Sequence, residues 1–351
     1  MSVQRRLVQK NSVGGQAARW LLLLTLGIGV SAGGNVVGVR PSPATAATTF
    51  RNPVIESDFA DPDIIRVGKT YYAYSTNTGG VNVPVFSSAD LVKWNALKDA
   101  LPVLPSWASG GNTWAPAVMA ANGGYRLYFT ARHTESGRQC IGVAASKLPQ
   151  GPFVSSSAKP LVCQLDEGGS IDAQGYTDAG GQHYLYWKSD GNCCNLLTGL
   201  WVQPLSPDGL KLAGKPKDLL YNGALWEGNL IEAPTVYRHA GRYYLFYSAA
   251  AWDSDTYAVG YAVGPSALGP FKKAAGNPIL FSGGGVAGPG GQGVIADGKG
   301  NTWMYYHAWK TGEIGYEGGG VRSLRLDPLS WKSGAPSVRP TTRSQPAPAR
   351  P

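Results

Sequence analysis

The aromatic segment YYLFYSA, at residues 243–249, occurs in related form five times along this 351-residue chain. The other copies are YYAYST (71–76), YRLYFTA (125–131), HYLYWKS (183–189) and WMYYHAW (303–309). Successive copies start 54, 58, 60 and 60 residues apart. A period this regular indicates a fold built from repeated units.

Each copy has the surroundings of a strand in an antiparallel sheet. A glycine-containing turn precedes it (VGK, NGG, AGG, HAG or GKG), and another short apolar run lies ahead of that turn. Examples of the first run are DIIRV (63–67) and PTVYR (234–238). A third run follows in at least four copies, as in IGVAAS (141–146) and VGYAVG (259–264). Each unit therefore contains three or more short strands.

Units of nearly 60 residues with several antiparallel strands are too large for a solenoid coil and match a propeller blade. The 11 tryptophans and 18 tyrosines suit the flat interfaces between blades. Helical periodicity is nearly absent. We therefore predict an all-β, five-bladed β-propeller over residues 50–331, with a β-sandwich of coincidentally regular spacing as the alternative.

The two ends of the chain differ from this body. Residues 1–46 combine a basic opening, the short apolar run WLLLLTLGIGV (20–30) and an A-x-A pattern at 44–46, so we predict a cleaved signal peptide and a secreted, extracellular protein. A membrane anchor is the alternative, although the run is short for a bilayer. The composition of residues 332–351 predicts a Pro/Arg-rich disordered tail or linker.

The formal net charge of +9 comes from these ends. Removing residues 1–46, which hold five basic residues and no acidic one, lowers it to +4, and four basic residues lie in 332–351. The body is close to neutral, so we predict no nucleic-acid partner and, after signal removal, no membrane partner. We expect a monomer.

Four cysteines fall in the predicted mature chain: Cys140, Cys163, Cys193 and Cys194. In an oxidising compartment, an even number suggests disulfides. We expect a Cys140–Cys163 bridge, which leaves Cys193 and Cys194 as a vicinal pair on a loop after HYLYWKS, where a disulfide would form part of a substrate wall. Cross-pairing and free thiols are the alternatives. Zinc binding is not expected, because no CxxC spacing accompanies nearby histidines.

The residues that open each repeat are expected to converge, because the innermost strands of a propeller surround its axis. In chain order they are Asp61-Pro62, Trp114-Ala115-Pro116, Ile171-Asp172, Glu232-Ala233-Pro234 and Gly288-Pro289. Asp61, Asp172 and Glu232 then occupy equivalent places in blades one, three and four. Each alone is explained as a turn residue. Their equivalence predicts an axial pocket with three carboxylates.

Three carboxylates in one cavity repel one another, and this raises the pKa of at least one of them. A protonated carboxyl near an ionised one is the arrangement that glycoside hydrolysis requires. One group protonates the leaving oxygen, while the other activates water or attacks the sugar. The pattern therefore predicts an enzyme that cleaves glycosidic bonds.

The sequence resembles glycoside hydrolase family 43 over nearly the whole predicted domain. The segments that carry the resemblance are FADPDIIRVGKTYYAY, TWAPAVMAANGGYRLYFTA, SIDAQGYTDAGGQHYLYW, IEAPTVYRHAGRYYLFYSA and GPGGQGVIADGKGNTWMYYHAW. The resemblance implies a five-bladed propeller that cleaves arabinofuranosides or xylosides with inversion.

The resemblance also implies a role for each site residue. Asp61 matches the general base, Glu232 the general acid, and Asp172 the carboxylate that keeps the pKa of the acid high. An inverting base and acid stand roughly 6.5–9.5 Å apart. Arg322, in VRSLRLDPLSW, matches an arginine that reaches into the pocket; an ordinary surface charge is the alternative.

Two positions depart from the family pattern. Ala173 replaces a proline after Asp172, with no loss expected. Gln292 stands where many arabinan-cleaving relatives carry a histidine that helps to hold calcium. The metal site is therefore left unassigned, a structural calcium ion is left open, and no cofactor is expected for the chemistry. His307 is either a channel residue or a buried histidine bonded within its strand.

Aromatic side chains near the ends of the inner strands are expected to stack on sugar faces. The candidates are Phe59, Trp114, Trp187 and Trp252, of which Trp114 is the best placed.

These features predict a secreted inverting glycoside hydrolase that cleaves α-L-arabinofuranosyl linkages in plant cell-wall arabinan or arabinoxylan, with a polysaccharide or oligosaccharide as its partner. A β-xylosidase with the same motifs is the first alternative. A non-catalytic carbohydrate-binding propeller is the second, although it should lack one of the three carboxylates. A β-fructosidase shares the architecture but uses a retaining nucleophile and different motifs.

Overall fold

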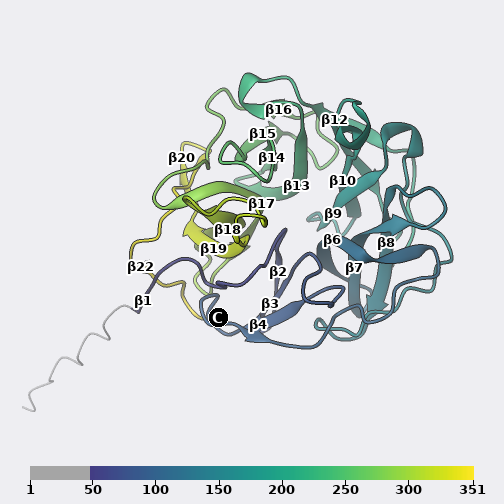
Figure 1. Cartoon of the computed structure of the whole chain (residues 1–351), viewed down its shortest axis with the longest axis horizontal. Helices are drawn as coiled ribbons and strands as arrows, with labels where there is room; N and C mark the ends of the chain where they lie inside the picture. The colour runs from purple at the N-terminus through teal and green to yellow at the C-terminus, as the bar shows by residue number, and fades with distance from the viewer. Residues whose placement is uncertain (1–47) are drawn as a thin grey trace, which may run out of the picture. The chain divides into compact units, whose positions relative to one another are not determined.

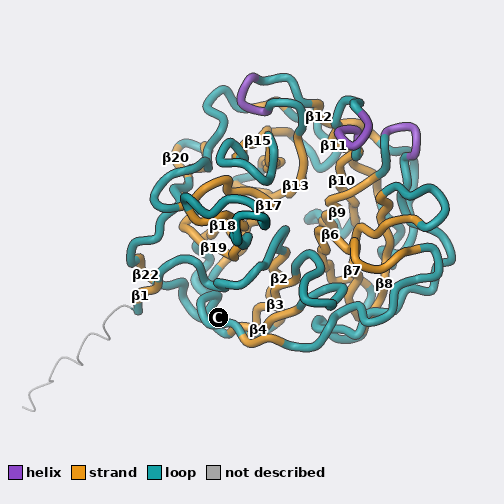
Figure 2. Tube along the Cα trace, viewed as in Figure 1, coloured by secondary structure: helices purple, strands orange, loops and turns teal. Residues whose placement is uncertain are grey.

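The computed structural model describes residues 48–351, which form five antiparallel sheets around a common centre (Figure 1). The predicted five-bladed β-propeller is confirmed. Figure 2 shows that strands and loops make up nearly all of the described chain, with three short 3₁₀ turns as its only helical pieces: Leu165–Glu167, Gly191–Cys194 and Leu225–Glu227. None of the described helices is long or apolar enough to cross a membrane. The predicted signal peptide at 1–46 lies outside the described residues.

The blades follow the chain in order, and each begins at the centre. Blade one contains β2 (Asp63–Val67), β3 (Thr70–Tyr74), β4 (Val85–Ser88) and β5 (Asn95–Ala96). Blade two contains β6 (Ala108–Ala121), β7 (Gly124–His133) and β8 (Gln139–Ser146). Blade three contains β9 (Ser170–Thr177), β10 (His183–Ser189), β11 (Gly199–Pro204) and β12 (Lys217–Tyr221).

Blade four contains β13 (Ile231–His239), β14 (Arg242–Ala249), β15 (Ala258–Gly264) and β16 (Lys272–Lys273). Blade five contains β17 (Val286–Ala296), β18 (Thr302–Lys310) and β19 (Ser323–Pro328). The five aromatic repeats lie on the second strands, β3, β7, β10, β14 and β18. The innermost strands, β2, β6, β9, β13 and β17, surround the centre of Figure 1.

The core is divided among the interfaces between blades. Five clusters of buried apolar residues each draw on two neighbouring blades, and the fifth joins blade five to blade one. Tyr74 and Leu127, for example, both fully buried, belong to the cluster between blades one and two. Burying these faces supplies the main driving force for the ring, and the repeated aromatic residues serve this packing.

The ring is closed by chain that lies outside the five repeats. The segment before blade one pairs with β19, through the backbone of Val54 and Ile55 on Leu324. β1 (Thr49–Phe50) pairs with β22 (Gln345–Pro346), and the two lie side by side in Figure 1. Both ends of the described chain therefore help to hold blade five against blade one.

The prediction that residues 332–351 form a disordered tail is wrong. β20 (Ser330–Lys332) pairs with β21 (Ala335–Ser337), and β22 follows. Val338 and Gln345 are buried, and the Gln345 amide donates to the Leu326 carbonyl and to Asp327. A composition poor in apolar residues cannot build its own core, but here it is held by hydrogen bonds to a core that already exists.

Candidate active site

The entry to each inner strand has the same backbone conformation. Asp61, Ala115, Asp172, Ala233 and Gly291 all have a positive φ, of 49°, 40°, 56°, 50° and 57°. Two residues after each of them, the inner strand has a residue that pairs with the second strand, and this pair is equivalent in all five blades. Left-handed backbone at non-glycine residues is unfavourable and is held only where its surroundings enforce it. These five positions line a narrow space at the axis.

These five positions correct two of the predicted equivalences between residues of different blades. Glu232 lies one residue before the position that matches Asp61, which is occupied by Ala233. In blade five the match is Gly291, rather than Gly288 and Pro289. Asp61 and Asp172 are true equivalents. The three carboxylates still line one cavity, because consecutive residues at the same bend both reach it.

A second set of five side chains, one from each blade, surrounds the five bent backbone positions. In each blade, one residue on the second strand or just after it lies two positions beyond the residue that pairs with the inner strand: Thr76, Thr130, Lys188, Ser248 and His307. In four blades this side chain accepts a hydrogen bond from the bent backbone of the next blade. The distances are 3.0 Å from Ala115 N to Thr76, 3.3 Å from Asp172 N to Thr130, 2.9 Å from Gly291 N to Ser248 and 2.9 Å from Asp61 N to His307.

Blade three is the exception, because its second-strand position is a lysine, which has no acceptor. Lys188 is fully buried and its Nζ lies 2.8 Å from Glu232 Oε2 and 3.9 Å from Asp190 Oδ1. The Ala233 N–H donates instead to Asp172 Oδ2 at 2.9 Å. In blade three, Lys188 therefore contacts Glu232 and Asp190, and Asp172 takes over the hydrogen bond to the bent backbone of blade four.

Asp61 sits among groups that favour its ionised form. Its Oδ2 accepts from Thr76 at 2.6 Å, and the Arg322 guanidinium lies 3.3 Å from Oδ1. Burial raises the pKa of Asp61, but the charge of Arg322, the neighbouring His307 ring and the Thr76 hydrogen bond together outweigh burial, so the net pKa is lowered. Asp61 is therefore ionised at neutral pH.

Asp172 has the opposite character. Burial, followed by the charge of Glu232, raises its pKa to about 8, against a lowering effect of Lys188. Glu232 accepts from the Tyr257 hydroxyl at 2.7 Å on Oε1 and from Lys188 on Oε2. The cavity therefore contains both an ionised carboxylate, Asp61, and a carboxyl group that retains a proton at neutral pH, Asp172.

The pocket above the axis has a volume of about 520 Å³. Asp61, Asp172 and Glu232 line it together with Trp114, Trp252 and Arg322, so these six predicted residues are brought to one place. Further lining residues that the sequence did not single out include Asp58, Lys188, Asp190, Asn192 and Tyr316, while Cys193 also contributes. Their hydrogen bonds cross between blades, which no local sequence pattern reveals.

Arg322 is anchored on the Asp61 side of the pocket. Its guanidinium lies 4.6 Å from the ring centroid of Trp252 and its Nε donates to the Tyr316 hydroxyl at 3.0 Å. Its backbone N–H donates to Asp58 at 3.0 Å. Arg322 is 8% exposed, which excludes the alternative of an ordinary surface charge.

Two predicted sugar-stacking residues are wrong. Phe59 is 1% exposed and packs edge-on against Phe86 in the interface between blades five and one. Trp187 is 1% exposed, lies in the interface between blades two and three and donates its indole N–H to Gln164. A residue next to the inner strand can point either to the pocket or between blades, and these two point between blades.

The channel residues considered for calcium are bonded to protein groups. The Gln292 side-chain oxygen accepts from Ser248 at 2.7 Å and its NH₂ group donates to the Ala233 carbonyl at 2.9 Å. His307 accepts at Nδ1, which assigns the proton to Nε2 and makes that nitrogen a donor. His307 is thus buried in its strand but bonded to blade one.

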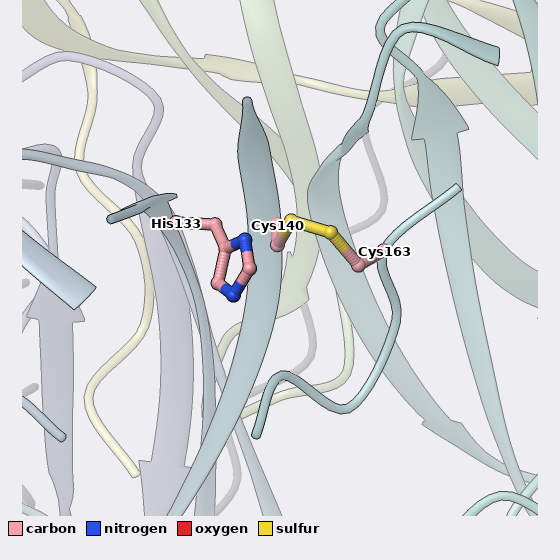
Figure 3. A group of neighbouring side chains, drawn as sticks. All are labelled: His133, Cys140 and Cys163. Carbon is pink, nitrogen blue, oxygen red and sulfur yellow. A yellow bond between two sulfur atoms is a disulfide. The ribbon is translucent and has the colours of Figure 1, made fainter. Parts of the chain in front are cut away.

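A second group of metal-binding residue types lies in blade two. Figure 3 shows His133 beside Cys140 and Cys163, whose sulfur atoms are bonded to each other. A disulfide has no thiolate to offer, so this group is not a metal site. The expected Cys140–Cys163 bridge is confirmed, and Cys193 is joined to Cys194.

Comparison with known proteins gives one consistent family. The model for glycosyl hydrolases family 43 matches residues 50–336. The extracellular endo-α-(1→5)-L-arabinanase 1 of Bacillus subtilis is 28% identical over 79% of this chain and 86% of its own. Arabinan endo-1,5-α-L-arabinosidase C of Emericella nidulans is 30% identical over 76% and 87%. The crystal structure of a thermostable family-43 glycoside hydrolase superposes with a TM-score of 0.78 at 31% identity, covering 86% of this chain and 100% of that one.

Proposed function

The chain belongs to glycoside hydrolase family 43 and hydrolyses glycosidic bonds, and we propose that its reaction is the inverting cleavage of α-L-arabinofuranosyl linkages in arabinan or arabinoxylan. The observation that carries this proposal is the pairing of an ionised Asp61 with a protonated carboxyl in one pocket. Relatives named as arabinan-cleaving enzymes support the choice of sugar. The name of the Bacillus relative also supports export of this chain.

In the proposed reaction Asp61 is the general base. Its lowered pKa keeps it ionised and ready to take a proton from water. Arg322 approaches it from blade five and Thr76 donates to it from blade one, and these two contacts fix the direction of the carboxylate. An attacking water held by Asp61 on one face of the sugar gives inversion when the leaving group departs from the other face.

Glu232 is the proposed general acid, and Asp172 the carboxyl that keeps a proton available to it. Burial and the charge of Glu232 raise the pKa of Asp172 to about 8, so Asp172 holds a proton at neutral pH. Lys188 and Tyr257 each hold one oxygen of Glu232. They position the carboxyl group so that the proton passes to the leaving-group oxygen once substrate fills the pocket.

A β-xylosidase is the second candidate, because relatives with xylan-directed names also match. A putative β-xylosidase of Xylanibacter ruminicola is 25% identical over 83% of this chain, although the match spans 50% of that protein. A solved structure described as an endo-1,4-β-xylanase from Bacteroides thetaiotaomicron has a TM-score of 0.70 at 27% identity.

A substrate panel tests the proposal: an aryl α-L-arabinofuranoside, an aryl β-D-xyloside, linear arabinan and arabinoxylan. We expect hydrolysis of the arabinofuranoside and of at least one arabinose-containing polymer. Hydrolysis of the xyloside alone would favour the β-xylosidase. Asp61→Asn, prepared in the same way, serves as the matched control, and a large loss of activity in it assigns the hydrolysis to this chain and not to contaminating enzymes. No hydrolysis of any substrate by the wild type would favour a carbohydrate-binding propeller.

A further inference from the structure

The Cys193–Cys194 disulfide joins adjacent residues at the edge of the substrate pocket. The two cysteines end the 3₁₀ turn Gly191–Cys194, and Asp190, Asn192 and Cys193 line the pocket in succession. A bridge between neighbours closes no loop of chain and so does not stabilise the fold by restricting the unfolded state. Its placement at the pocket calls for another explanation.

The loop that carries this disulfide is held in one position. Arg138 Nη1 donates to Cys193 Sγ at 3.2 Å and to Cys194 Sγ at 2.7 Å. Gly168 packs directly beneath: a Cβ there would lie 3.2 Å from Cys193 Sγ and 2.6 Å from the Asp190 carbonyl oxygen. The disulfide is therefore a preformed part of the pocket wall, and preformed contacts cost little ordering entropy when a ligand binds.

This wall lies on the side of the proposed acid. Lys188 contacts both Glu232 and Asp190, and Cys193 follows Asp190 by three residues. The wall formed by Arg322 and Trp252 belongs to the Asp61 side instead. Because the acid protonates the glycosidic oxygen, the sugar beyond that oxygen has to lie on the Glu232 side.

A vicinal disulfide is suited to pack against the C–H face of a sugar ring. Its sulfur atoms are polarizable, have no strong hydrogen-bond donor, and present a small, rigid apolar surface. Asp190 and Asn192, on the same loop, supply an acceptor and an amide for sugar hydroxyl groups. We propose that the Cys193–Cys194 disulfide is the platform for the leaving-group sugar of the substrate. This inference rests on the proposed glycosidase function.

Protection from reduction tests the platform directly. In a Glu232→Gln background, which prevents consumption of the ligand, the enzyme is treated with a phosphine reductant, alkylated at intervals and digested for mass spectrometry. We expect an arabino-oligosaccharide at about ten times its Kd to slow labelling of Cys193 and Cys194 by about tenfold, because protection scales as 1 + L/Kd, where L is the oligosaccharide concentration. Free arabinose, which fills only the site between acid and base, should give no protection. Cys140–Cys163, in the same digest, is the internal control.

Kinetics of Cys193→Ser/Cys194→Ser provide a second measurement. The KM for the oligosaccharide should rise about tenfold, while kcat/KM for arabinofuranosyl fluoride, whose leaving group is a single atom, should stay within about twofold. Hydrolysis of the fluoride also shows that the variant is folded. An equal loss on both substrates, or no loss on either, would contradict the platform.

The outcomes separate this inference from the proposed function. If the wild type cleaves the substrates but the oligosaccharide gives no protection, the platform is contradicted and the glycosidase function stands. If the wild type cleaves none of them while the oligosaccharide still protects Cys193 and Cys194, the disulfide is only a sugar contact in a binding site, and both the proposed reaction and the leaving-group role of the platform fall.

Discussion

At the scale of the residue, the chemistry rests on backbone that most side chains avoid. Asp61 and Asp172 both have positive φ values, which aim them at the axis instead of along their strands. The repeat in the sequence predicted this convergence correctly for both. It selected Glu232 as well but placed it one residue out of register, and the resemblance to the family then assigned its role as the acid. Lys188 was missed because its partners belong to other segments of the chain.

Replacing Glu232 by Gln removes a proton donor but keeps the shape of the side chain. We expect the rate on substrates with poor leaving groups to fall by about 10²–10⁴, while aryl glycosides with activated leaving groups lose far less. Steady-state rates on both substrate types measure this difference. Glu227→Gln is the matched control, because Glu227 is a fully buried glutamate outside the pocket. Equal loss on both substrates would exclude Glu232 as the acid.

Asp172→Asn should make the protein more stable and less active. The pKa of Asp172 rises from 3.8 to about 8 in the folded state, so the folded state binds more protons between these values and wild-type stability falls as pH rises through them. Asn removes this penalty and keeps an oxygen for the Ala233 N–H. The gain in unfolding free energy should therefore be larger at pH 8 than at pH 5.

Denaturant unfolding at both pH values measures the gain. Asp61→Asn is the matched control with the opposite sign. The pKa of Asp61 is lowered in the folded state, so its contribution to stability is present above its ordinary pKa and is lost as pH falls. Asp61→Asn should therefore destabilise the protein at pH 8. A destabilised Asp172→Asn at pH 8 would contradict the assigned protonation.

At the scale of the element, the sequence predicted the strands well because each strand pair is local. HYLYWKS and DIIRV coincide with β10 and β2 to the residue. The turns between them contain the glycines that a tight reversal requires. The errors concern non-local partners. Phe59 and Trp187 were misplaced because alternation along a strand does not say which side faces the pocket.

The two disulfides should differ in their effect on stability. Cys140 and Cys163 are 23 residues apart, and a loop of that length corresponds to about 3 kcal/mol of restricted unfolded-state entropy. Cys140→Ala/Cys163→Ala should lower the unfolding free energy by about this amount, whereas Cys193→Ser/Cys194→Ser should cost less than about 1 kcal/mol. Thermal unfolding of both double variants measures the contrast, and equal losses would contradict it.

At the scale of the whole molecule, the ring depends on closure between its first and last blades. The repeat predicts five blades but does not say how the ring closes. Closure is built from unrepeated chain: β1, β22 and the segment that pairs with β19. This is why residues 332–351 were mistaken for a linker, since their order depends on contacts with residues nearly 300 positions away, such as Thr49 with Pro346.

Removing residues 345–351 should destabilise the protein without changing its chemistry. The truncation deletes β22, the Gln345 hydrogen bonds to Leu326 and Asp327, and the Ala349 N–H donation to Asp297. Leaving such buried groups unpaired costs about 1–3 kcal/mol each. We expect a lower Tm and an unchanged kcat well below it, because no residue of β22 lines the pocket. An unchanged Tm would indicate that this segment does not stabilise the closed ring of blades.

The central claim is that Asp61 activates water on one face of the sugar while Glu232 protonates the leaving oxygen on the other. Proton NMR of the first product formed from an aryl α-L-arabinofuranoside tests this most directly, before mutarotation mixes the anomers. Inversion at the α-L-arabinofuranoside releases β-L-arabinofuranose first. If α-L-arabinofuranose appears first, the reaction proceeds with retention, and Asp61 cannot be the base that the structure supports.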